Sequence, residues 1–332
     1  MSVQETNLTA IADAIRLKEG STDSIPASSF AERIAAIQTG APLPSWGIST
    51  LSSSGFWIGP AYGDGKFVIA RSQSTEAAYS TDGINWETIR LPVKVSAYKI
   101  AYCGGKFLIT DAYASSDIML YSLDGINWGT ITLPISGSWR GFAYGNGKFV
   151  AVSGMESSDA IYSVDGITWS HAILPTGVTW LENVAYGNGV FVAIAKNPIY
   201  STDGVHWNNS TSLASISGSG GWKYVMYGNG KFVASKSSSN IAAYSMDGIN
   251  WTSIKLPFSA SWGTPIYRGG KFLIPARDEG YVIYSTDGIN WSQSILPITK
   301  DCYTCGYGDG KIILTTTTNN LFYIQDTYAA LP

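Results

Sequence analysis

The chain has 332 residues, of which 45% are apolar and 14% are charged, and its net charge is −3. This length can bury one large core or two ordinary ones, and the near-neutral charge shows no basic footprint, so no nucleic-acid partner is expected. No apolar run approaches the ~20 residues needed to cross a bilayer, so membrane insertion is not expected. The first residues lack the basic and apolar blocks of a secretory signal. Three cysteines in a chain of this length do not indicate a disulfide framework, so reduced thiols are expected.

Residues 1–41 have the pattern of two short amphipathic helices. In the stretch NLTAIADAIRLKEG, apolar residues recur at helical spacing from Leu8 onward, and Gly20 ends the stripe. In SSFAERIAAIQTG, Ser29 begins a capping box and Gly40 supplies the stop. Two such short helices cannot bury both apolar stripes alone, so we expect this segment to bind a partner.

From residue 42 onward, two short phrases alternate along the chain. The first phrase reads AYGDGKF or a near-copy, and its seven copies begin at Ala61, Ala101, Ala143, Ala185, Met226, Ile266 and Gly306. The second reads Tyr-Ser-x-Asp-Gly-x-x-Trp, and its six copies end at Trp86, Trp128, Trp169, Trp207, Trp251 and Trp291. These tryptophans lie 42, 41, 38, 44 and 40 residues apart, a period typical of propeller repeats.

Each period predicts four short strands. In the first, Phe56–Tyr62 passes through a Gly-Asp-Gly turn into Lys66–Ala70, and Ala78–Ser80 passes through an Asp-Gly turn into Trp86–Leu91. Asn-Gly and Asp-Gly pairs supply the positive φ angles that tight hairpin turns require. Four strands with two tight hairpins in each period indicate one β-propeller blade.

The seventh period lacks its fourth strand before the chain ends. The segment SWGISTL fits the missing strand, because Trp46 precedes Trp57 by 11 residues, as Trp128 precedes Trp139. We expect Trp46–Thr50 to supply the outer strand of the last blade and so close the ring. The predicted fold is all-β: a seven-bladed β-propeller over residues 42–332, closed by this N-terminal strand and preceded by the short two-helix module.

The candidate binding surface lies on the face opposite the tight hairpins, where the connections differ in length and chemistry between blades. Binding residues tend to sit on such connections over a rigid scaffold. Aromatic residues near the starts of the inner strands could stack on sugar faces, with charged neighbours binding hydroxyls. Equally, one aromatic residue per blade suits packing between blades. The candidate binding residues are Trp57, Tyr98, Trp139, Arg140, Trp180, Trp222, Lys223, Trp262, Arg277, Asp278, Glu279, Asp301 and Tyr303.

The sequence predicts no catalytic residue, metal site or cofactor. His171 and His206 are the two histidines, and both fit ordinary strand and turn positions. No spacing suggests a zinc site, no Gly-rich loop precedes a helix, and Cys302-x-x-Cys305 falls in a predicted strand. A glycosidase would need two facing carboxylates. The candidates for such a pair are Glu156, Glu182, Asp278, Glu279 and Asp301.

The second phrase resembles the Asp-box of sialidase-type propellers, although it is one residue shorter between Asp and Gly in every copy. In that family the box is a folding element, so the resemblance implies a turn-building role for Ser80, Asp82, Trp86 and their equivalents. The Arg-Ile-Pro motif of sialidases is missing, and its nearest match is FLIPARDEG at Phe272. Sialidase activity is therefore not expected.

The stretch NLTAIADAIR resembles the N-terminal helical module of tail and baseplate proteins of phages and prophages. The resemblance implies a non-catalytic receptor-binding or adhesin component of a phage or tailocin tail that contacts host cell-surface glycan. Residues 7–40 would then attach it to other tail or baseplate subunits, with a homo-oligomer expected. Its location would be the virion tail, after synthesis in the bacterial host cytoplasm. The alternatives are a glycan-cleaving tail enzyme and a purely structural tail or baseplate protein.

Overall fold

The structure is a computed structural model of the chain. It describes residues 46–112, 116–154, 159–195, 198–210, 213, 215–216, 221–268, 270–277, 279–295 and 302–325. The helices predicted over residues 1–41 lie outside the described residues. The described part contains no helix, and therefore none able to span a membrane.

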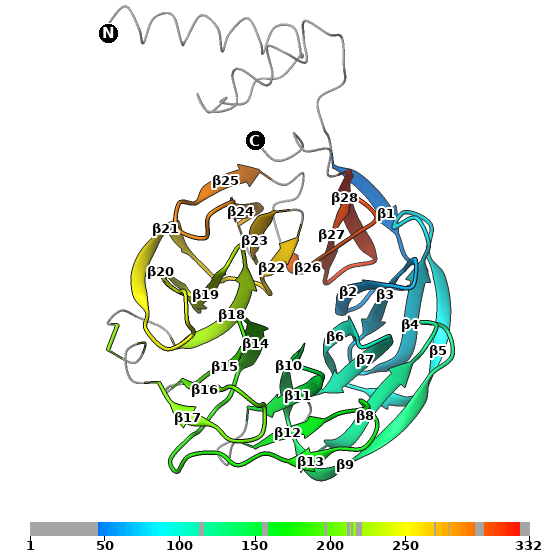
Figure 1. Cartoon of the computed structure of the whole chain (residues 1–332). Helices are drawn as coiled ribbons and strands as arrows, with labels where there is room; N and C mark the ends of the chain where they lie inside the picture. Colours follow the sequence, from blue (N-terminus) through cyan, green and yellow to red (C-terminus); the bar gives the residue numbers. More distant parts are fainter. Residues whose placement is uncertain are drawn as a thin grey trace, which may run out of the picture.

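Seven four-stranded antiparallel sheets are arranged as blades around a central axis (Figure 1). From the inner strand outward, the first three blades are β2 (Trp57–Gly63), β3 (Lys66–Arg71), β4 (Ser74–Ser80) and β5 (Glu87–Val95); β6 (Ala97–Cys103), β7 (Lys106–Asp111), β8 (Ser116–Ser122) and β9 (Gly129–Gly137); and β10 (Trp139–Gly145), β11 (Lys148–Ser153), β12 (Ala160–Ser163) and β13 (Ser170–His171). The next two are β14 (Asn183–Gly187), β15 (Val190–Ile194), β16 (Ile199–Ser201) and β17 (Asn208–Asn209); and β18 (Trp222–Gly228), β19 (Lys231–Lys236), β20 (Ser239–Ser245) and β21 (Thr252–Ala260). The sixth is β22 (Ile266–Arg268), β23 (Lys271–Ala276), β24 (Tyr281–Ser285) and β25 (Ser292–Ile295).

The seventh blade joins the two ends of the propeller. It consists of β26 (Cys302–Gly308), β27 (Lys311–Thr316), β28 (Asn320–Gln325) and, as its outer strand, β1 (Gly47–Thr50). β1 pairs antiparallel with β28, with Gly47 opposite Tyr323. The Ser49 hydroxyl donates a hydrogen bond to the Ile84 carbonyl in the first blade. The strand that precedes the first blade in sequence therefore completes the last one.

The core lies between neighbouring blades. The middle strands carry a fully buried aromatic ring and small or branched apolar side chains, as in β3, where Phe67, Val68 and Ile69 are all 0% exposed. One cluster joins Phe67 and Ile69 of the first blade to Ile313 and Leu321 of the seventh. Because each blade buries its faces against its neighbours, the inner strands are held rigidly around the axis.

The second repeated phrase builds a hydrogen-bonded turn between the third and fourth strands. In the first blade, the Gly83 amide donates to Ser80 Oγ at 2.8 Å, and the Ile84 and Asn85 amides donate to Asp82 Oδ1 at 2.8 Å each. The same three bonds recur at Ser122/Asp124, Ser163/Asp165, Ser201/Asp203, Ser245/Asp247 and Ser285/Asp287. Six copies of one turn explain the six copies of the phrase in structural terms.

One predicted strand boundary needs correction. The third strand of the first blade was expected over Ala78–Ser80, but β4 begins at Ser74. Ser74 pairs with Val95 across a bulge, which lengthens the hairpin beyond the repeated phrase.

Candidate functional site

Four inner strands begin with the same irregularity, a β-bulge one residue into the strand. The register shifts occur between Ala97 and Lys99, Trp139 and Gly141, Trp222 and Tyr224, and Cys302 and Thr304. A bulged residue is left out of the ladder, and its side chain is re-aimed. The four residues at the bulges are Tyr98, Arg140, Lys223 and Tyr303, each of them half-buried. All four belong to the binding set predicted from the sequence.

Arg140 connects three blades. Its Nη1 donates to Glu182 Oε1 at 2.7 Å, and Glu182 directly precedes β14 of the fourth blade. The guanidinium carbon lies 5.9 Å from the ring centroid of Tyr98 in the second blade. The ion pair and the cation–π contact together fix the guanidinium among the second, third and fourth blades.

Arg277 likewise contacts residues of two other blades. It follows β23 in the sixth blade, and its Nη2 donates to the Tyr224 hydroxyl at 2.8 Å. Its guanidinium carbon lies 4.8 Å from the ring centroid of Tyr303 in the seventh blade. Tyr303 packs edge-on against Phe56 with centroids 4.5 Å apart. Arg277 thus connects the fifth, sixth and seventh blades.

These residues form one electrostatically coupled group, which we call the mouth cluster. Its members are Tyr98, Arg140, Glu182, Lys223, Tyr224, Arg277 and Tyr303. Burial raises the pKa of Tyr98 most, the charges of Tyr224 and Glu182 raise it further, and the two arginines oppose them. Burial also lowers the pKa of Lys223, and the neighbouring Arg277 lowers it further. The cluster therefore contains three cationic side chains, Arg140, Lys223 and Arg277, and one carboxylate, Glu182.

Two atoms of the mouth cluster are buried without a hydrogen-bond partner among the described residues: Glu182 Oε2 and Arg277 Nε. An unsatisfied buried polar atom costs roughly 1–3 kcal/mol, so each is a point at which a bound group would gain energy. Glu182 Oε2 accepts a hydrogen bond, and Arg277 Nε donates one.

Four of the tryptophans in the predicted binding set lie inside the fold. Trp57, Trp139 and Trp262 are 0–1% exposed, and Trp222 is 6% exposed. The indole of Trp139 donates to the Ser116 carbonyl at 3.1 Å, and that of Trp262 to the Ser239 carbonyl at 2.6 Å. All four belong to hydrophobic clusters that span neighbouring blades, so the prediction that they stack on a ligand does not fit their burial. The alternative prediction, packing between blades, does fit.

The remaining predicted residues lie apart from the cluster or outside the structure. Trp180 is 46% exposed, with φ of +57°, in the segment that leads to β14. Glu279 is exposed between β23 and β24. Asp278 and Asp301 lie outside the described residues. Within the described part, neither Trp180 nor Glu279 has a hydrogen bond, ion pair or ring contact with the mouth cluster.

Sequence reasoning missed Tyr224 and gave Glu182 only as a catalytic carboxylate. The signal for Glu182 is the alignment of the repeats, because it occupies the same column as Tyr98, Arg140, Lys223 and Tyr303. Tyr224 stands in the next column and carries no comparable signal. Among the residues that the structure describes, no group of three His, Cys, Asp or Glu side chains is placed to hold a metal.

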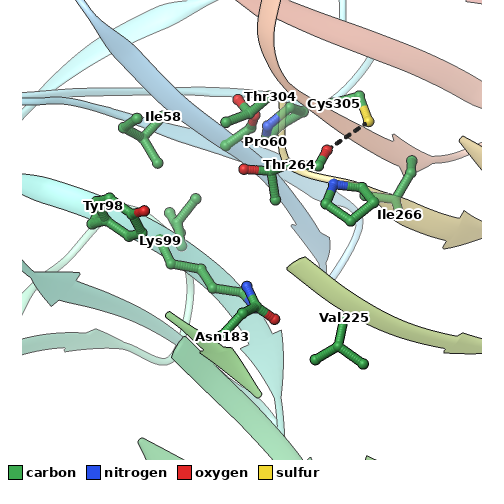
Figure 2. Close-up of a pocket in the computed structure, with 13 residues that line it drawn as sticks. Ile58, Pro60, Tyr98, Lys99, Asn183, Val225, Thr264, Ile266, Thr304 and Cys305 are labelled. Atoms are coloured by element: carbon green, nitrogen blue, oxygen red, sulfur yellow. Dashed lines mark hydrogen bonds between the residues drawn. The ribbon is translucent and has the colours of Figure 1, made fainter. Parts of the chain in front are cut away.

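A cavity of about 120 Å³ lies between the inner strands (Figure 2). Tyr98 belongs to the mouth cluster and also lines this cavity, together with Lys99, Asn183, Thr264 and Cys305. The Cys305 thiol donates to the Thr264 carbonyl at 3.4 Å. Sequence analysis did not identify this cavity, because its walls come from strands of six different blades.

The comparisons with known proteins identify the fold. No protein-family model and no curated protein matches the chain. The structure is similar to virginiamycin B lyase from Staphylococcus aureus, with 11% identity and a TM-score of 0.73 over 85% of this chain and 99% of that one. It is similar to a streptogramin B lyase (9%, 0.72, 84% and 97%) and to YCF48 bound to D1 peptide (16%, 0.64, 85% and 97%). At these identities the likeness shows a seven-bladed β-propeller and carries no ligand or reaction to this chain.

Proposed function

We propose that this chain is the receptor-binding component of a phage or tailocin tail and that its propeller binds an acidic glycan of the bacterial surface without cleaving it. The observation that supports this most is the mouth cluster, in which Arg140, Lys223 and Arg277 face a single carboxylate. The helical pattern of residues 7–40 supports the tail assignment, because it resembles modules that attach to other tail subunits.

The chemistry of the cluster favours a ligand that carries both acidic groups and hydroxyls. Guanidinium groups bind carboxylate or phosphate through parallel hydrogen bonds, and Arg277 has a buried Nε without a partner among the described residues. Glu182 Oε2 would accept a hydrogen bond from a hydroxyl. An acidic sugar supplies both kinds of group within a few bonds.

If a tail carries several copies of this protein, weak binding by each propeller is sufficient. If several copies engage one surface, linkage raises the overall avidity by roughly 10²–10⁴ without any new contact. We therefore propose a homo-oligomer in the virion tail, assembled through residues 7–40.

Glycan cleavage is the less favoured alternative. Glycosidases use two carboxyl groups that flank the scissile bond. Within the described residues, the mouth cluster contains one carboxylate, and Glu182 already forms an ion pair with Arg140. The similarity to lyases concerns the fold alone and therefore does not favour glycan cleavage.

The test is a binding assay of the full-length protein on intact cells and isolated walls of candidate bacteria, with released reducing sugar measured in the same samples. Arg277→Gln should weaken saturable binding at least tenfold. Arg268→Gln is the matched control, because Arg268 is exposed at the other end of an inner strand of the same blade. Binding that survives Arg277→Gln, or sugar release that accompanies binding, would overturn the proposal.

A further inference from the structure

Lys99 places an amine in the wall of the cavity. It follows the bulged Tyr98 on β6, and Figure 2 shows its side chain extending across the cavity toward Asn183. Its Nζ donates to the Phe142 carbonyl at 3.2 Å. An ammonium has three donors, and this is the one hydrogen bond that Nζ makes with the described residues.

Among the described residues, the cavity wall offers no counter-charge to Lys99. Those that line the cavity include no aspartate or glutamate. The nearest carboxylate of the mouth cluster, Glu182, is paired with Arg140. Buried charges in proteins are ordinarily paired, because an isolated one loses its hydration without compensation. An uncompensated ammonium in a cavity is therefore a site of attraction for an anion.

The pKa values of Lys99 and its neighbours also support binding of an anion. Burial lowers the pKa of Lys99 to about 8, which leaves most of the amine protonated at neutral pH. Burial raises the pKa of Cys103 to about 12 and also raises those of Tyr98 and Cys305. These three groups thus stay neutral over the range in which Lys99 loses its charge.

We propose that the cavity binds a small carboxylate, with its anionic end on Lys99 Nζ beside the Asn183 side chain. The apolar end of the ligand would lie against Ile100, Val225 and Pro265, which form part of the same wall. A volume of about 120 Å³ exceeds what one water needs and suits a ligand of a few heavy atoms. This site is distinct from the glycan site at the mouth and does not depend on it.

The test uses sodium trifluoroacetate as the probe and the full-length protein, followed by fluorine NMR. Saturable broadening of the probe signal is expected at pH 6.5. Lys99→Met should weaken binding at least tenfold, and Lys99→Gln should do the same, which guards against a folding defect in one variant. Lys94→Met removes an exposed cation on the outer strand β5, away from the cavity and the mouth cluster, and should leave the affinity within twofold.

Measuring the affinity for the probe at two pH values tests whether the charge on Lys99 is responsible for binding. Raising the pH from 6.5 to 9 should weaken binding by about tenfold, because pH 9 lies one unit above the pKa of Lys99. The lysine variants should show no such dependence. The absence of saturable binding, equal binding in the wild type and the Lys99 variants, or an equal loss in Lys94→Met would each overturn the proposal.

Discussion

Arg140 Nη1 donates to Glu182 Oε1 at 2.7 Å, an ion pair of the mouth cluster that connects the third and fourth blades. The two side chains are 26% and 19% exposed. The pair neutralises one of the three cations in the mouth cluster. Lys223 and Arg277 therefore carry the charge that remains for a ligand.

Glu182→Gln should strengthen the binding of an acidic glycan. The change frees the charge of Arg140 but keeps an acceptor for hydroxyls, so we expect binding to become about threefold to tenfold tighter. The free energy of unfolding should fall by about 1 kcal/mol, since the pair is only partly buried. Binding isotherms on cell walls measure the first effect, and urea unfolding measures the second.

The matched control for this change is Glu76→Gln. Glu76 pairs with Arg71 at 2.9 Å and is also 19% exposed, but it lies outside the mouth cluster. It should lower stability by a similar amount and leave glycan binding unchanged. If both variants tighten binding equally, the mouth cluster has no special role.

The turn carboxylates should make stability depend on acid pH. Burial alone would raise the pKa of Asp247, but hydrogen bonds from Asn250 and Ile249 outweigh it and hold the pKa at about 2. A folded-state pKa below the unfolded value of roughly 3.9 gives stability that is present above pH 4 and lost as the pH falls toward 2. Asp247→Asn should therefore flatten the fall of the urea midpoint across this range. A variant that falls as steeply as the wild type would contradict this account.

Gly83→Ala tests the tight approach of the first turn to the seventh blade. Gly83 has φ of +71°, and an added Cβ would lie 2.8 Å from Ile313 Cδ1 and 3.1 Å from Phe67 Cε2. We expect a loss of about 2–4 kcal/mol from backbone strain and overpacking together. Gly65→Ala is the control, because its φ is +69° but nothing lies within 4 Å, so about 1 kcal/mol is expected. Equal losses in urea unfolding would show that the inter-blade contact is unimportant.

Removal of β1 tests ring closure. A chain that starts at residue 42 keeps the partner of β28, whereas one that starts at residue 53 leaves β28 as an open edge. We expect the shorter chain to unfold at lower urea concentration and to aggregate, since an unpaired edge recruits other strands. The longer one should match the full-length protein in urea unfolding and remain monodisperse in light scattering. Equal stability and solubility of the two truncations would contradict the closure.

Most of the fold can be predicted from the sequence, because each blade repeats the same turn residues. The Ser80–Asp82 turn and the paired glycines fix two hairpins per period. Because the seventh period lacks its fourth strand, the strand that contains Trp46 can be assigned to the last blade. The start of β4 at Ser74 was not predicted, because it depends on a cross-strand bulge opposite Val95 rather than on a local phrase.

The candidate site was only partly predictable. Tyr98 was identified as one of the repeated aromatic residues, and Arg140 and Lys223 were identified because each stands beside such a residue. For Trp139 and Trp262 the sequence left two alternatives open, stacking on a ligand and packing between blades, because it does not show which way a ring faces. Lys99 was missed because most of the other residues that line the cavity come from other blades.

The most direct test of the central claim is a comparison of acidic and neutral oligosaccharides on a glycan array, probed with the full-length protein, Arg277→Gln and Arg268→Gln. The account predicts binding to glycans that carry carboxylate or phosphate, at least a tenfold loss in Arg277→Gln, and wild-type binding in Arg268→Gln. Equal binding of neutral and acidic glycans, or binding unaffected by Arg277→Gln, would contradict it.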